Sequence, residues 1–396
     1  MSRDASVLLP NGEKLKPLLK KSVITESDMQ IFLKKRGVFN VSKERKNAVQ
    51  FLTTTLISPK EFEELQEIQK TKEDNLKVRN RTLRSKTENN LFEVIDPDLI
   101  DSEELEKLEN ECTFETDTAV NVENENHLYI EYEILREDIT LDWANINRKF
   151  TGRVDIIKDI ETGEIHFSSE YTSGETEEIN SEIIKRISDS LKELDEVEKG
   201  TVLGRYSSGR LKNKNRMRFL LALANDIQGE NLKFKSVKNI EIGRDKTLQM
   251  AMQETGLLFD DGVKNVIING EKGETLNNIE YIVNEAYYDF LILRALQVEY
   301  NFDYESAKGV CILEFGFPHY FRKAQKSQEF EVVVNKVYLN KGCRGENNKS
   351  ITRKILKDFN SFYQEEFDAI LEQQEQQEQQ EQQEQQEQQE QQEQQE

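Results

Sequence analysis

The chain has 396 residues, of which 36% are hydrophobic and 33% charged, and its formal net charge is −22 at pH 7. This length allows two or three domains. Cys112, Cys311 and Cys343 are too far apart for a disulfide framework or a CxxC zinc knuckle, so a reducing, cytoplasmic environment is expected. No secretory signal and no apolar run of membrane-spanning length is apparent, so no membrane association is expected.

The negative charge is distributed unevenly along the chain. Residues 1–86 hold 19 Lys+Arg against 11 Asp+Glu, a net charge of +8, whereas residues 87–126 hold 1 against 14, a net charge of −13. The acidic segment is either a solvated spacer or a cover for the basic region that a polyanion displaces. Charge runs are usually solvated, which favours the spacer.

Within the basic region, the stretch Ile24–Ile57 predicts two short helices joined by an extended segment at Val38–Val41. Ser42 is the expected cap of the second helix. A third helix follows, in which Ser58 and Glu61 have the spacing of a capping box.

This pattern resembles the SAP-like helix–extended–helix family, through Leu33–Val38, Lys43–Lys46, Val49 and Leu52. In that family the loop and the N-terminus of the second helix face the nucleic-acid backbone. The resemblance implies a SAP-like module in residues 1–86 that binds nucleic acid, DNA rather than RNA. The expected phosphate contacts are Lys34, Lys35, Arg36, Lys43, Arg45 and Lys46. The alternative is a helical docking domain with a solvated charged face.

Two further stretches are basic. Lys77–Lys86 either extends a track for phosphate or forms a flexible basic arm. Lys199–Arg218 contains 7 Lys+Arg and no acidic residue, and Tyr206 offers a surface for base stacking. Its candidate contacts are Arg205, Arg210, Lys212 and Lys214. The alternative is a solvated loop before a helix.

The rest of the chain is expected to be an acidic linker at 87–126, a mixed α/β domain at 127–371 and a low-complexity tail at 372–396. Apolar patterns predict strands at 129–134, 153–157, 165–171, 232–242, 263–268, 310–313 and 330–337, and helices at 177–197, 217–227, 276–300 and 350–371. With the N-terminal module, this predicts an α+β protein.

The strand–turn–strand–helix unit within 127–198 resembles the core of the PD-(D/E)xK nucleases. Asp155 and Glu170 stand at the carboxylate positions, which in that family hold Mg²⁺. Thr172 stands where the family has lysine, so the unit is an active site, a degenerate nuclease-like domain or an unrelated hairpin. Mg²⁺ is expected only under the first interpretation. The three histidines lack metal-ligand spacing, so no other metal or cofactor is expected.

From Glu372 the sequence repeats Glu-Gln-Gln. A period of three matches neither 3.5 nor 3.6 residues, and the repeat has no apolar residue to bury. It is expected to be disordered or a frayed continuation of the last helix. Its deletion is expected to leave activity intact.

In overall layout the chain resembles accessory subunits of two-gene bacterial antiphage nuclease systems. Together with the charge polarity and the incomplete catalytic constellation, this predicts a non-catalytic, DNA-binding subunit that works with an effector protein in antiviral defence. The alternatives are a metal-dependent nuclease and a protein-interaction scaffold.

Overall fold

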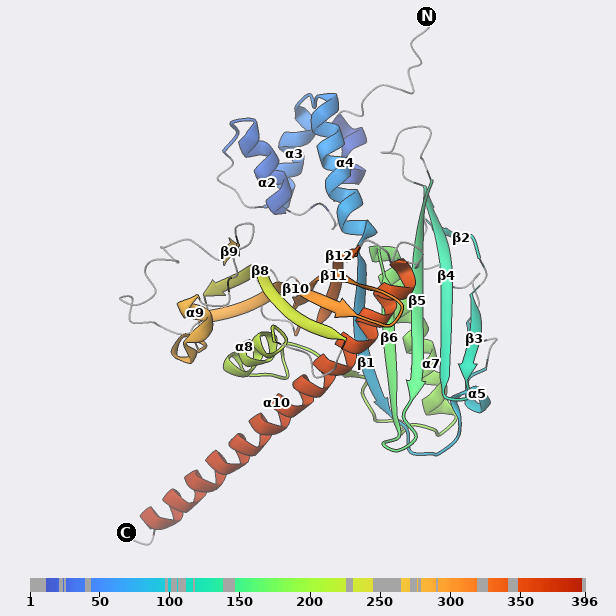
Figure 1. Ribbon diagram of the computed structural model, residues 1–396, viewed down its shortest axis with the longest axis vertical. Helices are drawn as coiled ribbons and strands as arrows, with labels where there is room; N and C mark the ends of the chain where they lie inside the picture. Colours follow the sequence, from blue (N-terminus) through green and yellow to red (C-terminus); the bar gives the residue numbers. More distant parts are fainter. Residues whose placement is uncertain are drawn as a thin grey trace, which may run out of the picture. The chain divides into compact units, whose positions relative to one another are not determined.

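The computed structural model has an α+β fold that combines helices with antiparallel strands (Figure 1). Two compact units divide the chain: Met1–Leu76 with Thr82–Leu203, and Lys77–Arg81 with Gly204–Glu396. The residues that the structure describes are 12–20, 24, 26–39, 44–96, 99–100, 105, 112–116, 118–137, 147–225, 231–244, 265–270, 276, 279–289, 291–318, 327–340 and 348–393.

The first unit opens with a helical module. Its elements are η2 (Gly12–Leu15), α1 (Lys16–Lys20), α2 (Glu26–Lys35), α3 (Arg45–Thr54) and α4 (Pro59–Asp74). Leu15, Leu18, Met29, Leu52 and Leu65 are among the fully buried residues of its core. The predicted capping box of α4 is confirmed, because Ser58 and Glu61 exchange both hydrogen bonds. The predicted cap Ser42 and most of Val38–Val41 lie outside the described residues.

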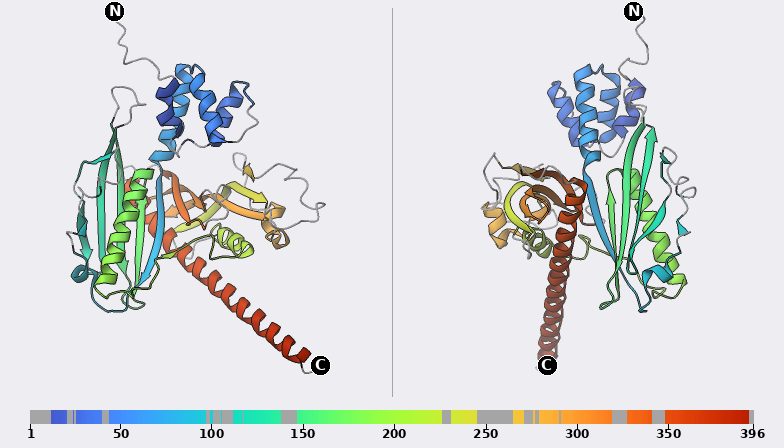
Figure 2. Two further views of the ribbon diagram at one scale, coloured as in Figure 1. Left: turned by 180° about the vertical axis from the view of Figure 1, so that it is seen from behind. Right: turned by 45° about the vertical axis from the view of Figure 1, so that its right-hand side comes forward.

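An antiparallel sheet forms the rest of the first unit (Figure 2). Its strands are β2 (Cys112–Phe114), β3 (Ala119–Asn124), β4 (His127–Glu137), β5 (Asn147–Lys158) and β6 (Glu164–Tyr171), in the order β2-β4-β5-β6, with β3 also paired to β4. The end of β1 (Leu76–Arg84), from Thr82, follows β6. Helix α7 (Gly174–Glu193) covers one face, because Ile179, Ile183 and Ile187 recur on its buried side.

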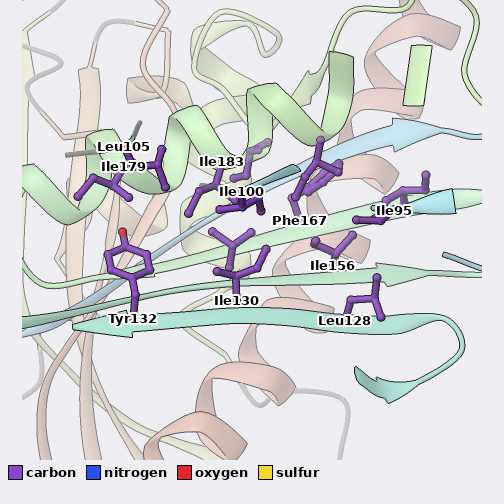
Figure 3. Packing of buried hydrophobic residues seen from close by; sticks show 14 of the residues in the cluster. Ile95, Ile100, Leu105, Leu128, Ile130, Tyr132, Ile156, Phe167, Ile179 and Ile183 are labelled. Atoms are coloured by element: carbon purple, nitrogen blue, oxygen red, sulfur yellow. The ribbon is translucent and has the colours of Figure 1, made fainter. Parts of the chain in front are cut away.

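The core between α7 and the sheet includes residues from the segment predicted to be a linker (Figure 3). These residues are Leu91 of α5 (Leu91–Val94), Ile95, Ile100, Leu105 and Cys112, each at most 8% exposed. Interpreting 87–126 as a spacer was therefore wrong for these positions. Acidic residues dominate the segment, but its apolar side chains supply part of the core.

The second unit contains a second antiparallel arrangement, with the order β1-β12-β11-β10-β8-β9 and β7 also paired to β1. Its elements are β7 (Gly204–Arg205), α8 (Asn213–Ala222), β8 (Leu232–Arg244), β9 (Asn265–Asn269), α9 (Glu280–Val283), η4 (Glu285–Tyr287), β10 (Leu291–Asp303), β11 (Lys308–Gly316), β12 (Glu331–Leu339) and α10 (Asn348–Glu393). Aromatic rings fill its core, with Phe330 and Tyr363 at a centroid distance of 4.7 Å and Phe219 and Phe367 at 5.2 Å.

Two predictions about the second unit were wrong. The helix predicted at 276–300 is replaced by α9, η4 and the first part of β10. Strand β10 pairs with β8 and β11, and both of its faces carry buried side chains, which gives an apolar run without alternation. Of the two interpretations of Lys77–Lys86, a phosphate track or a flexible arm, the flexible arm is wrong, because the residues up to Arg84 lie inside β1. In the part of the chain that the structure describes, no helix is long and apolar enough to cross a bilayer.

Candidate nucleic-acid interface

The basic residues of the helical module gather where α2 ends and α3 begins. Lys34 and Lys35 occupy the last turn of α2, where positive charge interacts favourably with the helix dipole. Gly37 follows at φ +75°, a left-handed conformation that ends the helix. Part of this positive charge therefore has a local structural explanation.

Arg36 joins the end of α2 to the start of α4. Its Nε and Nη2 donate to the two carboxylate oxygens of Glu61 at 2.6 and 3.1 Å, and Nη2 also donates to the carbonyl oxygen of Leu56 at 2.5 Å. The hydrogen bonds from Ser58, followed by those from Arg36, lower the pKa of Glu61 to about 2. The Arg36 guanidinium is therefore committed to the fold of the module.

Two other predicted phosphate contacts are also engaged within the module. The Lys35 ammonium lies 3.0 Å from the Glu64 carboxylate in an exposed ion pair. Arg45 donates from Nη2 to the carbonyl oxygen of Leu19 at 2.6 Å. An exposed pair such as Lys35–Glu64 is weak, so Lys35 could exchange its partner for a phosphate more easily than Arg36 or Arg45.

Lys34 and Lys46 differ from these three residues. Both are exposed, and the side chain of neither has a hydrogen bond or ion pair with another residue among those described. Lys34 lies in the last turn of α2 and Lys46 in the first turn of α3, at the ends that flank the connection between these helices. Lys43, the remaining candidate, lies outside the described residues.

Carboxylates from distant parts of the second unit pair with four of the seven cations in the basic stretch Lys199–Arg218. The ion pairs join Arg205 to Glu329 at 3.0 Å, Lys212 to Glu378 at 3.0 Å, Lys214 to Glu285 at 3.6 Å and Arg218 to Glu285 at 2.7 Å. The sequence window lacks acidic residues, but the folded surface around it does not.

The other side chains of this stretch have structural partners. Arg216 is 7% exposed and donates to the carbonyl oxygen of Ser208 at 3.0 Å. The Arg210 guanidinium lies 5.6 Å from the centre of the Phe367 ring. Tyr206, predicted as a stacking surface, is 5% exposed and packs against Tyr363 and Phe367. Its ring is therefore part of the core.

The cations of β1 are paired in the same way. Arg79 lies 2.8 Å from Glu331, and Arg81 lies 3.1 Å from Glu329, a residue 248 positions away in sequence. These pairs tie β1 to the start of β12 within the second unit. Their short distances and low exposure favour a structural role over a track for phosphate.

The nuclease-like carboxylates lie on the face of the first unit's sheet that is opposite α7. Asp155 accepts from Arg153 Nε and Nη2, both at 2.6 Å, and lies 3.0 Å from His127 Nε2. Glu170 is directly across from Arg153 in the β5–β6 register. Burial opposes the charge of Arg153, but Asp155 and its acidic neighbours outweigh burial and raise the pKa of Arg153.

This arrangement differs from a metal site because the Arg153 guanidinium already pairs with the Asp155 carboxylate, and Glu170 lies across from Arg153 and not from Asp155. Among the described residues, no group of three or more His, Cys, Asp or Glu side chains could hold a metal ion. His127, for which the sequence shows no metal-ligand spacing, lies between Asp155 and Glu123 and contacts both. The alternation of β4 and β5, which places these residues on one face, was the available signal.

A buried charged triad was not predicted from the sequence. Arg136 of β4 donates from Nη2 to both Glu73 oxygens at 3.1 and 2.9 Å and from Nη1 to Glu175 at 2.9 Å. The side chains of Arg136 and Glu73 are each 1% exposed. Burial opposes these charges, but their mutual attraction raises the pKa of Arg136 and lowers that of Glu175.

Comparison with known proteins bears on the helical module. The family model of the GAPS4b protein N-terminal domain, a domain of the antiphage-system type, matches residues 13–75. This match is consistent with a component of a bacterial antiphage defence system, and it covers the helical module only. No curated protein matches the chain.

A similarity to a solved structure is weaker. The crystal structure of DynU16, a protein of the dynemicin biosynthetic locus, aligns over 74% of this chain and 95% of its own, with 8% sequence identity and a TM-score of 0.17. A score this low does not indicate a shared fold.

Proposed function

We propose that this protein is a non-catalytic subunit of a bacterial antiphage defence complex, and that its helical module binds the backbone of DNA for a partner effector. The match of the GAPS4b N-terminal domain to residues 13–75 supports the defence role. The exposed ammonium groups of Lys34 and Lys46, which have no partner among the described residues, support the binding role. Their position on either side of the connection between α2 and α3 is the observation that carries the proposal.

The charge of the module indicates how strong this binding is. Residues 13–75 hold 13 Lys+Arg against 10 Asp+Glu, a net charge of +3. Each phosphate contact releases condensed counterions, so even a few lysines give binding that weakens as salt rises. The structure therefore favours weak, sequence-independent contact with the backbone over base readout.

The nuclease alternative has less support from the geometry. A metal at Asp155 would have to displace Arg153, which already donates to both carboxylate oxygens at 2.6 Å. The family's lysine position is Thr172, so the group that would stabilise charge is also missing. We therefore interpret this part of β5 and β6 as a structural polar network.

The test is fluorescence anisotropy with a labelled DNA duplex over a salt series. Replacing Lys34 and Lys46 by alanine should weaken binding about tenfold at low salt and reduce the slope of log K against log salt by about 1.8, because two contacts are lost. Arg36 is a poor choice for this test, since its loss also breaks the contact with Glu61. Unlabelled RNA added as competitor distinguishes DNA from RNA.

The matched control replaces Lys233 and Lys336, two exposed lysines of the second unit, by alanine. This variant has the same net charge as the test variant and should bind like the original protein. The proposal is wrong if the original protein shows no salt-dependent binding, or if the two double variants bind equally.

Protein docking is the second candidate, and a specific observation favours it. Ile31, Phe39, Phe51 and Leu56 of the module are large apolar residues that are between 47% and 78% exposed. If the module docks a partner protein, the substitutions Phe39→Asp and Leu56→Asp should each abolish copurification with a co-expressed effector and leave DNA binding unchanged. Retained copurification would exclude a docking role for these side chains.

A further inference from the structure

The Glu-Gln-Gln repeat is helical as far as Glu393, and the side chain of Gln374 is buried. Helix α10 continues without a break from Asn348 to Glu393. Gln374, the third residue of the first triplet, is 8% exposed, whereas Gln373 and Gln376 are exposed. Burying a polar amide is costly unless its hydrogen bonds are made, so this position calls for partners.

Gln374 has these partners in and just before α8, which lies beside α10 (Figures 1 and 2). Its Oε1 accepts from the backbone N–H of Lys212 at 2.7 Å and from Asn215 Nδ2 at 3.1 Å. Its Nε2 donates to the carbonyl oxygen of Arg210 at 3.2 Å. Both ends of the amide are used, and exchanging oxygen and nitrogen would place donor against donor.

These contacts supply the cap that α8 lacks at its N-terminus. Lys212 stands at the N-cap, makes no side-chain cap and is followed by no acidic residue in the first turn. In a capping box, a Glu or Gln three residues into the helix accepts the N–H of the N-cap residue. Here Asn215 holds that position, and Gln374 accepts the N–H from another helix.

We propose that Gln374 and Glu378 form a latch, here called the tail latch, which caps α8 and holds the basic stretch Lys199–Arg218 in its folded conformation. Glu378 lies one turn beyond Gln374 and pairs with the Lys212 ammonium at 3.0 Å. The Gln374 amide therefore holds the backbone of Lys212, and the Glu378 carboxylate holds the Lys212 side chain. The first triplets belong to the second unit and are no dispensable tail.

The helical period explains why Gln374, and not Gln377, lies on the buried face of α10. Gln374 lies seven residues after Phe367, so it continues the face that packs against Tyr206. Each step of three residues turns the helix by about 300°, which moves Gln377 away from this face. Loss or gain of whole triplets restores the same residues at 374 and 378. The latch therefore tolerates changes in repeat number as long as the chain reaches Glu378.

The test compares adjacent glutamines in the full-length protein. Gln374→Ala should lower the thermal midpoint of the second unit by about 4–8 °C and speed amide exchange around Lys212 about tenfold. Gln373→Ala is the matched control and should change neither, since Gln373 is exposed. Alanine favours helices, so helix propensity opposes the predicted loss.

Two truncations give an independent measurement. A chain ending at Leu371 should show the same loss as Gln374→Ala or a larger one, whereas a chain ending at Gln380 should match the full-length protein. Equal behaviour of the Gln374 and Gln373 variants in both measurements would overturn the proposal. So would an equal loss in the two truncations, because shortening of the helix would then be the cause.

Discussion

Arg136 offers the sharpest test of the electrostatics of this fold. Its guanidinium faces Glu73 and Glu175, and the side chains of Arg136 and Glu73 are each 1% exposed. Replacement by methionine keeps most of the side-chain volume and removes the charge. The Glu73 carboxylate is then left buried without its partner, the situation in which breaking an ion pair is most costly.

The size of this effect follows from proton uptake. A stranded carboxylate can become neutral, which at pH 7 costs a glutamate about 4 kcal/mol and about 1 kcal/mol at pH 5. Glu175 is 17% exposed and can reach water. Arg136→Met should therefore destabilise the first unit by about 4 kcal/mol at pH 7, within the range of about 3–5 kcal/mol for broken buried pairs.

The sign of the pH dependence is fixed by the same argument. The lowered pKa of Glu175 means that its ion pair contributes stability above the pKa of the unfolded state and loses that contribution as the pH falls. That contribution is constant between pH 7 and pH 5. The difference between the original protein and Arg136→Met should still shrink over this range, because neutralising the stranded carboxylate of the variant costs less at the lower pH. Adding Glu73→Gln to the variant removes the stranded charge and should recover more than half of the loss.

Urea unfolding at both pH values measures the difference, and hydrogen exchange of peptides from β4 and α7 assigns it to the first unit. Arg153→Met is the matched control on the opposite face of the same sheet. It should cost less than half as much, because Asp155 keeps His127 as a partner. A loss below about 1 kcal/mol at pH 7, or an equal loss at pH 5, would refute the reasoning.

Two other changes test local packing and capping. Gly152→Ala would place a methyl group against the buried Tyr132 ring, whose hydroxyl donates to Asn180 at 2.8 Å, so calorimetry should show a loss of about 2–3 kcal/mol. Gly174→Ala, where a Cβ meets nothing within 4 Å, should be near neutral. Glu61→Gln should cost about 1–2 kcal/mol at pH 7. Because the pKa of Glu61 is lowered to about 2, this difference should fade between pH 4.5 and pH 2, and a constant difference would contradict the capping argument. Exposed Glu63→Gln is its control.

Elements defined by local signals were predictable from the sequence. The Ser58–Glu61 capping box depends on residues three positions apart, and it is present in the structure. The apolar stripe of α7 recurs at helical spacing and is likewise buried. The alternation of apolar and polar residues identified β4, β5 and β6, each of which has one face in the core and one polar face.

Elements that depend on distant partners were not predictable. Strand β10 is buried on both faces because β8 and β11 flank it, and its sequence LILRALQVEY also suits a helix. The cations of β1 suggested a phosphate track or a flexible arm, because their partners Glu329 and Glu331 lie 248 and 252 positions from Arg81 and Arg79 in sequence. No window around Lys77–Lys86 contains that information.

The same reason limits inference of a nucleic-acid site from charge counts. A stretch of sequence that contains only positive charges makes a positively charged surface only if the fold brings no negative charges next to it. For Lys199–Arg218 the fold brings Glu285, Glu329 and Glu378, which pair with four of its seven cations. Lys34 and Lys46 remain without such partners among the described residues. Any polyanion should therefore be sought first on the helical module.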